Sequence, residues 1–547
     1  MTAAAPNPPP APTPSPATPP SVASTWGPLR HPVFRALWLA TVASNVGSWM
    51  HDTAATWLMT SLTTSTLLVA LMQTASSLPV LALSLPAGAL ADIVDRRRVL
   101  LVAQSWMLVG AAGMGLLALA GAMTPDRLLF FTFVLGLGNG LTAPAWQATL
   151  PDLVGKEQVA AAVSLNGAAM NIARAVGPAV GGLLVAAITP GGVFLLNAIS
   201  FAAVITALVR WRSRPRESVL PAERVMGAIN AGWRYLRHAP QVQAVLIRCG
   251  LFVLFASAPW ALLPALARYE LGLGALGYGL LFGCLGLGAV TGVAVLPRVQ
   301  ALISTDGLVL TATAVYAAGV AALALVRAPV LAGVALFTIG IAWIAVMPAF
   351  NVATQRASAD WVKARMLSMY VLMYMGGMAV GAALWGTVAT RLGPPGALLA
   401  AAGGMLLNFA AAIRWRLGAS DRLDMAPSGH WRAPVVAGDL HHDDGPVLVT
   451  VVYRVAPDDA IAFTRAMHDL GRLRRRDGAV SWGLFRDTAD PWHWLETFVA
   501  ESWGEHLRQH ARATVADLAI EAAARRYHRG EGLPAVEHFI HADTTAE

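Results

Sequence analysis

Long apolar segments alternate with short polar stretches along most of this chain. Each segment approaches the ~20 residues that an α-helix needs to cross the ~30 Å hydrocarbon core of a bilayer. The pattern therefore predicts an all-α membrane protein with about twelve transmembrane helices. The segments lie near residues 33–60, 65–91, 99–122, 127–150, 159–187, 191–211, 242–267, 275–297, 307–326, 328–351, 364–390 and 395–415.

The apolar segments fall into two related halves. A constant offset of 204 residues aligns, among other matches, the tripeptide Arg-Trp-Arg at 210–212 with the same tripeptide at 414–416. We expect two six-helix pseudo-repeats, at 31–211 and 241–416, separated by a cytoplasmic central loop at 212–240. Parallel repeats of this kind place the substrate between them, near the middle of the membrane.

The two ends of the chain have different compositions. Residues 1–30 are rich in Pro, Ala, Thr and Ser, which predicts a disordered tail. Residues 417–446 form a polar linker. From 447 to 543 the pattern changes to alternating strands and amphipathic helices in the order β-α-β-β-α-α-β, which predicts a small cytoplasmic α+β domain.

The charge content supports a membrane location. Charged residues make up 13% of the chain, about half of the ~25% that is typical of soluble domains, and 56% of the residues are hydrophobic. Among the loops that join the apolar segments, one alternate set carries about seventeen Lys and Arg residues and the other set carries four. The positive-inside rule therefore places both termini in the cytoplasm and the chain in the inner (plasma) membrane. Because topology explains the net charge of +8, we expect no nucleic-acid partner.

One loop, between the second and third apolar segments, matches the pattern G-x-L-a-D-r-x-G-R-R. The matching residues are Gly88, Leu90, Asp92, Arg96 and Arg97, whereas Asp95 stands where the pattern has its second Gly. In this loop the chain resembles transporters of the major facilitator superfamily. The stretch Leu-Pro-Asp-Leu-Val at 150–154 resembles its transmembrane secretion effector, or enterobactin-exporter-like, branch. The resemblance implies alternating access, with a cytoplasmic gate formed by Gly88, Asp92, Arg96 and Arg97. The alternative is that these charges only anchor the loop at the cytoplasmic face.

Two of the charged residues inside the apolar segments are candidates for coupling or substrate binding. An ionised carboxylate is costly in hydrocarbon, so Asp52 is a candidate for proton uptake and coupling. The alternative is that Asp52 is interfacial, near the outer end of its helix. Arg174 follows Asn171 by three residues and is a candidate for substrate binding or coupling. Its alternative role is a buried arginine, hydrogen-bonded to carbonyls in a tightly packed, glycine-rich helix.

The candidate substrate-binding residues differ in character between the two halves. The first half offers the amides Asn166 and Asn171, and the second half offers aromatic and thioether side chains, which adapt to varied apolar ligands. The latter are Trp343, Met347, Tyr370 and Tyr374. This contrast predicts a bulky, partly polar organic substrate. The alternative is that these side chains face lipid or neighbouring helices.

The order of the C-terminal elements resembles the ferredoxin-like unit of antibiotic-biosynthesis-monooxygenase-like proteins. Such units usually pair their sheets in dimers, so the resemblance implies a possible homodimer. His506 and His510 lie four residues apart on a predicted helix and could bind a metal, but no third ligand is evident in the sequence. We therefore predict no metal, no cofactor and no catalytic residue.

Together these patterns predict a proton-coupled exporter of a bulky amphipathic organic solute, such as a drug, a siderophore or a secondary metabolite. Its partners would be the lipid bilayer, protons and the solute. The sequence has no G-x-x-x-x-G-K-[ST] motif for ATP. Two alternatives stay open. The C-terminal domain could be an active monooxygenase-like enzyme fused to the transporter, or the chain could be an importer with a dimerising or sensing tail.

Overall fold

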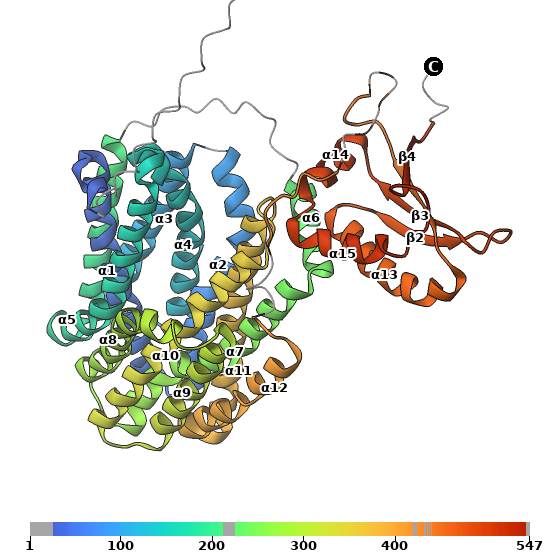
Figure 1. The fold of residues 1–547 in the computed structure, drawn as a ribbon. Coiled ribbons are helices and arrows are strands. Elements are labelled where there is room, and N and C mark those ends of the chain that lie inside the picture. The colour runs from blue at the N-terminus through green and yellow to red at the C-terminus, as the bar shows by residue number, and fades with distance from the viewer. Residues whose placement is uncertain are drawn as a thin grey trace, which may run out of the picture.

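A helical bundle and a small sheet domain lie side by side, with helix α6 between them (Figure 1). The computed structural model describes residues 26–93, 95–211, 225–418, 424–431, 434, 436, 438 and 440–542. Within these ranges, the side chains of residues 84–93, 156 and 225–230 lie outside the description.

The bundle contains nine helices, among the described residues, that are long and apolar enough to cross a membrane. Its elements are η1 (Gly27–Arg30), α1 (Pro32–Leu62), α2 (Thr66–Ile93), α3 (Arg96–Leu119), α4 (Pro125–Val154), η2 (Lys156–Gln158), α5 (Val159–Arg210), α6 (Val225–His238), α7 (Pro240–Ala265), η3 (Leu266–Glu270), α8 (Ala275–Gln300), α9 (Thr305–Leu325), α10 (Pro329–Arg356), α11 (Lys363–Gly404) and α12 (Leu407–Arg414).

Two apolar stretches are too long for a single crossing. Val159–Arg210 and Lys363–Arg414 each contain 52 residues, about 78 Å of helix against ~30 Å of hydrocarbon. Each contains a residue whose backbone angles are far from helical, Thr189 (φ 69°, ψ 161°) in the first and Gly393 (φ 69°, ψ 166°) in the second. A proline follows each of them, and both stretches are related by the same 204-residue offset. The internal repeat therefore extends to the backbone conformation of its breaks.

The packing of glycines is also repeated. Gly177 of α5 lies against Trp49 of α1, and its counterpart Gly381 of α11 lies against Ser257 of α7. Further along, a Cβ on Gly182 would lie 2.6 Å from the Ala275 carbonyl oxygen of α8, and the counterpart, Gly386, meets α2 in the same way. These small residues let the helix backbones approach closely. The glycines after Arg174 thus serve helix packing.

Thr189 holds a conformation that is essentially reserved for glycine, which costs ~1–3 kcal/mol. Its side chain is exposed, so little packing is lost when it is removed. We expect Thr189→Gly to increase the free energy of unfolding by a net ~1 kcal/mol, after the extra chain entropy of glycine is counted. The apparent midpoint of thermal unfolding in detergent should rise accordingly. The counterpart change, Gly393→Ala, is expected to lower the midpoint. A lower midpoint for Thr189→Gly would show that the backbone at Thr189 is not strained.

Expectations for three segments outside the membrane are wrong in part. The last residues of the predicted disordered tail form η1, where Leu29 packs against a buried cluster around Phe34. The predicted central loop contains α6, whose Tyr235 is fully buried and accepts a hydrogen bond from the Ala359 amide. In the predicted linker, Trp431 donates to the Glu521 carboxylate. Each segment is ordered by a partner distant in sequence, which local composition does not reveal.

The C-terminal domain is a four-stranded antiparallel sheet with helices. Its strands are β1 (Val447–Arg454), β2 (Ser481–Arg486), β3 (His493–Ala500) and β4 (Ala535–Ile540), in the spatial order β2-β3-β1-β4. Its helices are η4 (Pro457–Asp459), α13 (Ala460–Asp477), α14 (Trp503–Arg512) and α15 (Val515–Arg525). Side chains from the sheet, such as Val449 and Phe498, pack against Phe463 and Met467 of α13.

The C-terminal domain is docked on the bundle through charged and aromatic side chains. Arg234 of α6 forms a 2.9 Å ion pair with Glu505 of α14. The guanidinium of Arg476 lies 5.6 Å from the ring centre of Tyr235, and that of Arg512 lies 4.3 Å from the ring centre of Trp361, just before α11. The domain therefore contacts both α6 and the connection between α10 and α11.

Candidate functional site

The predicted gate loop lies at the junction of α2 and α3. The side chains of Gly88 and Asp92 lie outside the described residues. Asp95, which replaces the expected glycine, caps the N-terminus of α3 by accepting hydrogen bonds from the Arg97 and Arg98 amides. Arg96 forms a 3.1 Å ion pair with Asp152 at the end of α4.

The second arginine of the motif contacts the same half. Arg97 donates to the Leu208 and Val209 carbonyls at the end of α5. In this conformation the two arginines, Arg96 and Arg97, tie together the ends of helices within the first half. The structure describes no contact between either of them and the second half.

Asp52 lies on α1 and is exposed. Its helical spacing from Trp49 and Thr56 places the three residues on one face. Trp49 contacts Phe282 of α8, with ring centres 6.1 Å apart, and Tyr278 of α8 lies within electrostatic reach of Asp52. Asp52 therefore faces the junction of the two halves and forms no ion pair among the described residues.

Arg174 is half-buried on α5 and points toward the second half. Its guanidinium lies 5.7 Å from the ring centre of Trp49, and it acts electrostatically on Tyr374 of α11. Its Nε is buried and has no hydrogen-bond partner among the described residues. An unpaired buried guanidinium N–H is costly, so this group is available for an acceptor that the chain itself does not provide.

Five aromatic side chains form a continuous series around Arg174, which we name the central aromatic cluster. Phe282 lies 5.4 Å from Trp260, Trp260 lies 5.3 Å from Trp343, and Trp343 lies 6.0 Å from Tyr374, all between ring centres. The members come from α1, α7, α8, α10 and α11, and they are Trp49, Trp260, Phe282, Trp343 and Tyr374. A cation beside an aromatic wall can bind an anionic group joined to a ring-bearing body.

The other predicted substrate residues lie outside this cluster. Tyr370 uses its hydroxyl to donate to the Met347 carbonyl at 3.0 Å, and both residues are buried. Asn166 accepts a 3.2 Å hydrogen bond from the Trp146 indole within the first half. Asn171 is half-buried, one helical turn before Arg174. Of the residues predicted to bind substrate or couple transport, Arg174, Trp343 and Tyr374 thus lie together at the central aromatic cluster. The other predicted substrate-binding residues are not part of this cluster.

Sequence reasoning missed three members of the cluster, Trp49, Trp260 and Phe282. The spacing of Trp49 from Asp52 was a usable signal, because the two share a helix face. Another missed feature is Arg248, which lies inside the predicted seventh segment, is buried, and pairs with Asp306. Nothing in the apolar pattern around Arg248 indicated that this partner would come from the start of α9.

The two halves also meet at the end of the bundle where α1 ends. Tyr269 of η3 donates to the carbonyls of Thr60 and Thr63, at 3.0 Å and 2.9 Å. Arg268 donates to the Thr60 hydroxyl and lies 5.3 Å from the ring centre of Trp57. These contacts join the two halves at the end of the bundle opposite to the Arg96–Asp152 pair.

A family model described as "Transmembrane secretion effector" matches residues 23–546. The chain belongs to the transmembrane secretion effector family. The resemblance to the transmembrane secretion effector branch is thereby confirmed. Because the match extends through the C-terminal sheet, that domain lies within the part of this secretion effector that the family model covers.

Curated relatives of this secretion effector include enterobactin exporters of two organisms. Enterobactin exporter EntS of Shigella boydii serotype 4 is 27% identical over 387 residues, which cover 69% of this chain and 90% of that protein. Enterobactin exporter EntS of Salmonella typhimurium is 28% identical over 386 residues, covering 66% of this chain and 87% of that protein.

Solved structures show the fold. The nucleoside transporter NupG has a TM-score of 0.59 at 12% identity and covers 70% of this chain and 100% of its own. The D-xylose-proton symporter has a TM-score of 0.56 at 14% identity and covers 70% of this chain and 97% of its own. The family match over residues 23–546, together with the membrane-spanning helices, makes this secretion effector a multi-pass membrane transporter of the major facilitator superfamily, and the solved structures agree in fold.

Proposed function

We propose that this transporter exports a bulky, anionic, ring-bearing organic solute of the siderophore-like class. The observation that carries the proposal is Arg174, whose buried Nε lacks a partner among the described residues, next to the central aromatic cluster. The guanidinium supplies charge-assisted hydrogen bonds to an anionic group, and the aromatic rings stack on the rest of the solute. The likeness to enterobactin exporters supports this solute class.

We propose that Asp52 couples export to proton entry. Its carboxylate lies on the Trp49 face of α1 and forms no ion pair among the described residues, so protonation would change its charge without breaking a structural bond. A protonated Asp52 can enter a less polar environment than an ionised one. Proton binding at Asp52 would therefore favour the conformation in which this part of α1 is covered.

Twelve crossings account for the helices. Nine helices qualify by length and composition, the breaks at Thr189 and Gly393 divide two of them, and α1 adds one more. An even number agrees with both termini in the cytoplasm. In that orientation the Tyr269 contacts lie at the outer end. The cytoplasmic gate would then form only in the outward-facing state. Its residues would be Gly88, Asp92, Arg96 and Arg97.

The C-terminal domain is proposed to be a ferredoxin-like unit. Its strand order, β2-β3-β1-β4 with helices between β1 and β2 and between β3 and β4, supports this topology. Its docking on α6 and near Trp361 supports a cytoplasmic location for this domain in the proposed orientation. The resemblance to monooxygenase-like dimers makes a homodimer through this domain part of the proposal.

The test is transport of enterobactin in proteoliposomes that contain the purified full chain. We expect substrate transport to depend on an imposed pH gradient. The substrate should move in the direction opposite to that of the protons. Asp52→Asn is expected to abolish gradient-driven transport while substrate exchange at equal pH continues. Asp126→Asn, which changes an exposed carboxylate in the first turn of α4, is the matched control. Gradient-driven transport by Asp52→Asn at the wild-type rate would exclude the coupling role.

A further inference from the structure

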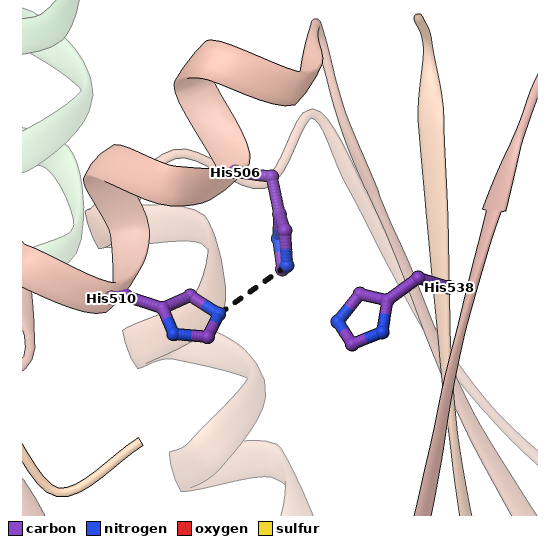
Figure 2. Close-up of side chains that lie close together, drawn as sticks. All are labelled: His506, His510 and His538. Atoms are coloured by element: carbon purple, nitrogen blue, oxygen red, sulfur yellow. Dashed lines mark hydrogen bonds between the residues drawn. The ribbon is translucent and has the colours of Figure 1, made fainter. Parts of the chain in front are cut away.

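Three histidines from two elements meet in the C-terminal domain. His506 and His510 lie on α14, and His538 lies on β4, with one nitrogen of each ring within 4.8 Å of the other two. Figure 2 shows the His538 ring extending from the strand toward the helical pair. His506 is fully buried, and the other two rings are half-buried.

The secondary structure explains why these rings converge. Residues four apart on a helix share a face, which brings His506 beside His510. On β4, His538 is directly opposite Val449 of β1, so the two side chains lie on the same face of the sheet. Val449 belongs to the domain core, and His538 therefore faces the helices rather than solvent.

The distances between the rings suit a shared ion. The Nε2 atoms of His506 and His510 are 3.3 Å apart. Two nitrogens bound to one tetrahedral ion at 2.0–2.1 Å would be separated by about 3.3 Å. On the other side of the His506 ring, Nδ1 lies 3.4 Å from the Gln509 side-chain oxygen. When Nδ1 donates to Gln509, Nε2 keeps its lone pair for a metal.

Burial favours the neutral form of two of the rings. Burial lowers the pKa of both His506 and His510 to about 4. Neutral imidazole is the form that binds a metal ion. One cation, Arg474, acts on both rings, but it is paired with Glu496 at 3.2 Å and with Glu521 at 3.6 Å.

Aromatic side chains pack around the three rings. Trp503 lies 5.5 Å from His506, and Trp431 lies 4.9 Å from His510, edge to face, between ring centres. An apolar shell of this kind limits water at a metal site and holds the ligand rings in position. The cluster is therefore arranged as a preformed donor set rather than as a solvated helix face.

We propose that His506, His510 and His538 form a binding site for one divalent transition-metal ion of the zinc class. Three imidazole nitrogens suit such ions, whereas Mg²⁺ and Ca²⁺ prefer oxygen ligands. Three protein ligands leave a fourth position open for water or another donor. The sequence showed two of these ligands on one helix, and the third comes from a separate element, the strand β4.

The proposed site lies on the helix that docks on the transporter. Glu505, the neighbour of His506, pairs with Arg234 of α6, and Arg512 at the end of α14 lies over Trp361. A metal that fixes α14 against β4 would therefore also stabilise the docked position of α6.

Cobalt absorption tests the site directly. The full chain is purified in detergent without a histidine tag and titrated with Co²⁺, whose visible d–d bands report tetrahedral coordination, and then with Zn²⁺ in competition. We expect one Co²⁺ per chain. His538→Gln and His510→Gln are each expected to weaken binding about 100-fold or more, since loss of even an outer-shell partner costs about 10–100-fold.

The matched controls are other histidines of the same domain and its linker. His468→Gln changes an exposed ring on α13, and His442→Gln tests adventitious binding in the linker. Both should bind Co²⁺ as the wild type does. Absence of a tetrahedral band in the wild type, or an unchanged band in His538→Gln, would overturn the site and leave the contact as a histidine–histidine hydrogen bond. Thermal unfolding of each variant without metal shows whether it is folded.

A second measurement tests the effect on docking. Zn²⁺ is expected to slow amide hydrogen exchange across residues 225–238 in the wild type and to leave it unchanged in His538→Gln. Unchanged exchange in the wild type, together with a normal Co²⁺ band, would overturn the link to α6 but not the site. Neither measurement depends on transport, so failure of the proposed export function would be seen separately.

Discussion

Arg174→Gln is expected to lower the apparent affinity for an anionic solute about 10- to 100-fold. A hydrogen bond to a charged group contributes ~1.5–3 kcal/mol, and the glutamine keeps polarity but removes the charge. The buried Nε of Arg174 has no hydrogen-bond partner among the described residues, so the substitution breaks no such bond of Nε. The fold should therefore persist while transport fails. Initial rates in proteoliposomes over a range of substrate concentrations measure the effect.

Two further variants test whether the effect depends on the charge of Arg174, on the shape of its guanidinium or on its position in the bundle. Arg174→Lys keeps the positive charge but loses the planar fork of donors, so an intermediate loss is expected. Arg298→Gln removes an exposed arginine at the end of α8 that donates to the Ala294 carbonyl, and it should transport normally. Wild-type affinity in Arg174→Gln would show that Arg174 serves only packing, the alternative considered from the sequence.

The second large effect is expected at Arg476. This buried guanidinium donates to Asp477 and Asp517, at distances between 2.6 Å and 3.0 Å, and both carboxylates are buried. Arg476→Met leaves two buried charges without this partner, which costs ~3–5 kcal/mol. It also removes the guanidinium over Tyr235, so the docking of the domain on α6 should loosen.

Hydrogen–deuterium exchange of β1 to β4 in the full chain measures the loss of stability in Arg476→Met. The dependence of that loss on pH provides a second test. Burial raises the pKa of Asp477 even though Arg476 opposes it. Without Arg476, the folded domain would bind protons more tightly than the unfolded chain, so its stability would rise as pH falls. The destabilisation should be smaller at about pH 5.5 than at about pH 7.5.

Arg472→Met is the matched control for Arg476→Met. Arg472 is exposed and pairs with Asp469, which is exposed too, so the expected change is ~0–1 kcal/mol. Equal exchange in Arg476→Met and Arg472→Met would contradict the importance of the buried pair. The comparison is sharp because both arginines lie on α13.

Much of the membrane architecture was predictable from the sequence. Hydrocarbon requires long apolar helices wherever the chain crosses it, so each crossing is visible as a local run of residues. The repeat was equally visible, because the 204-residue offset relates Arg-Trp-Arg at 210–212 and 414–416. The two backbone breaks, at Thr189 and Gly393, are related by the same offset.

The C-terminal strands were predictable for a similar reason. The alternation of apolar and polar residues from 447 onward predicted strands in this domain, and the first of them, β1, runs from Val447 to Arg454. The docking of this domain was not predictable, since Arg476 and Arg512 look like solvent-exposed charges until Tyr235 and Trp361 are placed beside them.

The sequence by itself determined where the chain crosses the membrane, that its two halves are repeated, and which charged residues lie in apolar segments. Tertiary structure alone decided that Arg174 meets Trp343 and Tyr374, and that His538 joins the histidines of α14. The physical reason is that burial and helix period act on neighbouring residues, whereas a site is built by packing elements far apart in the chain. A residue's role there depends on partners that no local pattern contains.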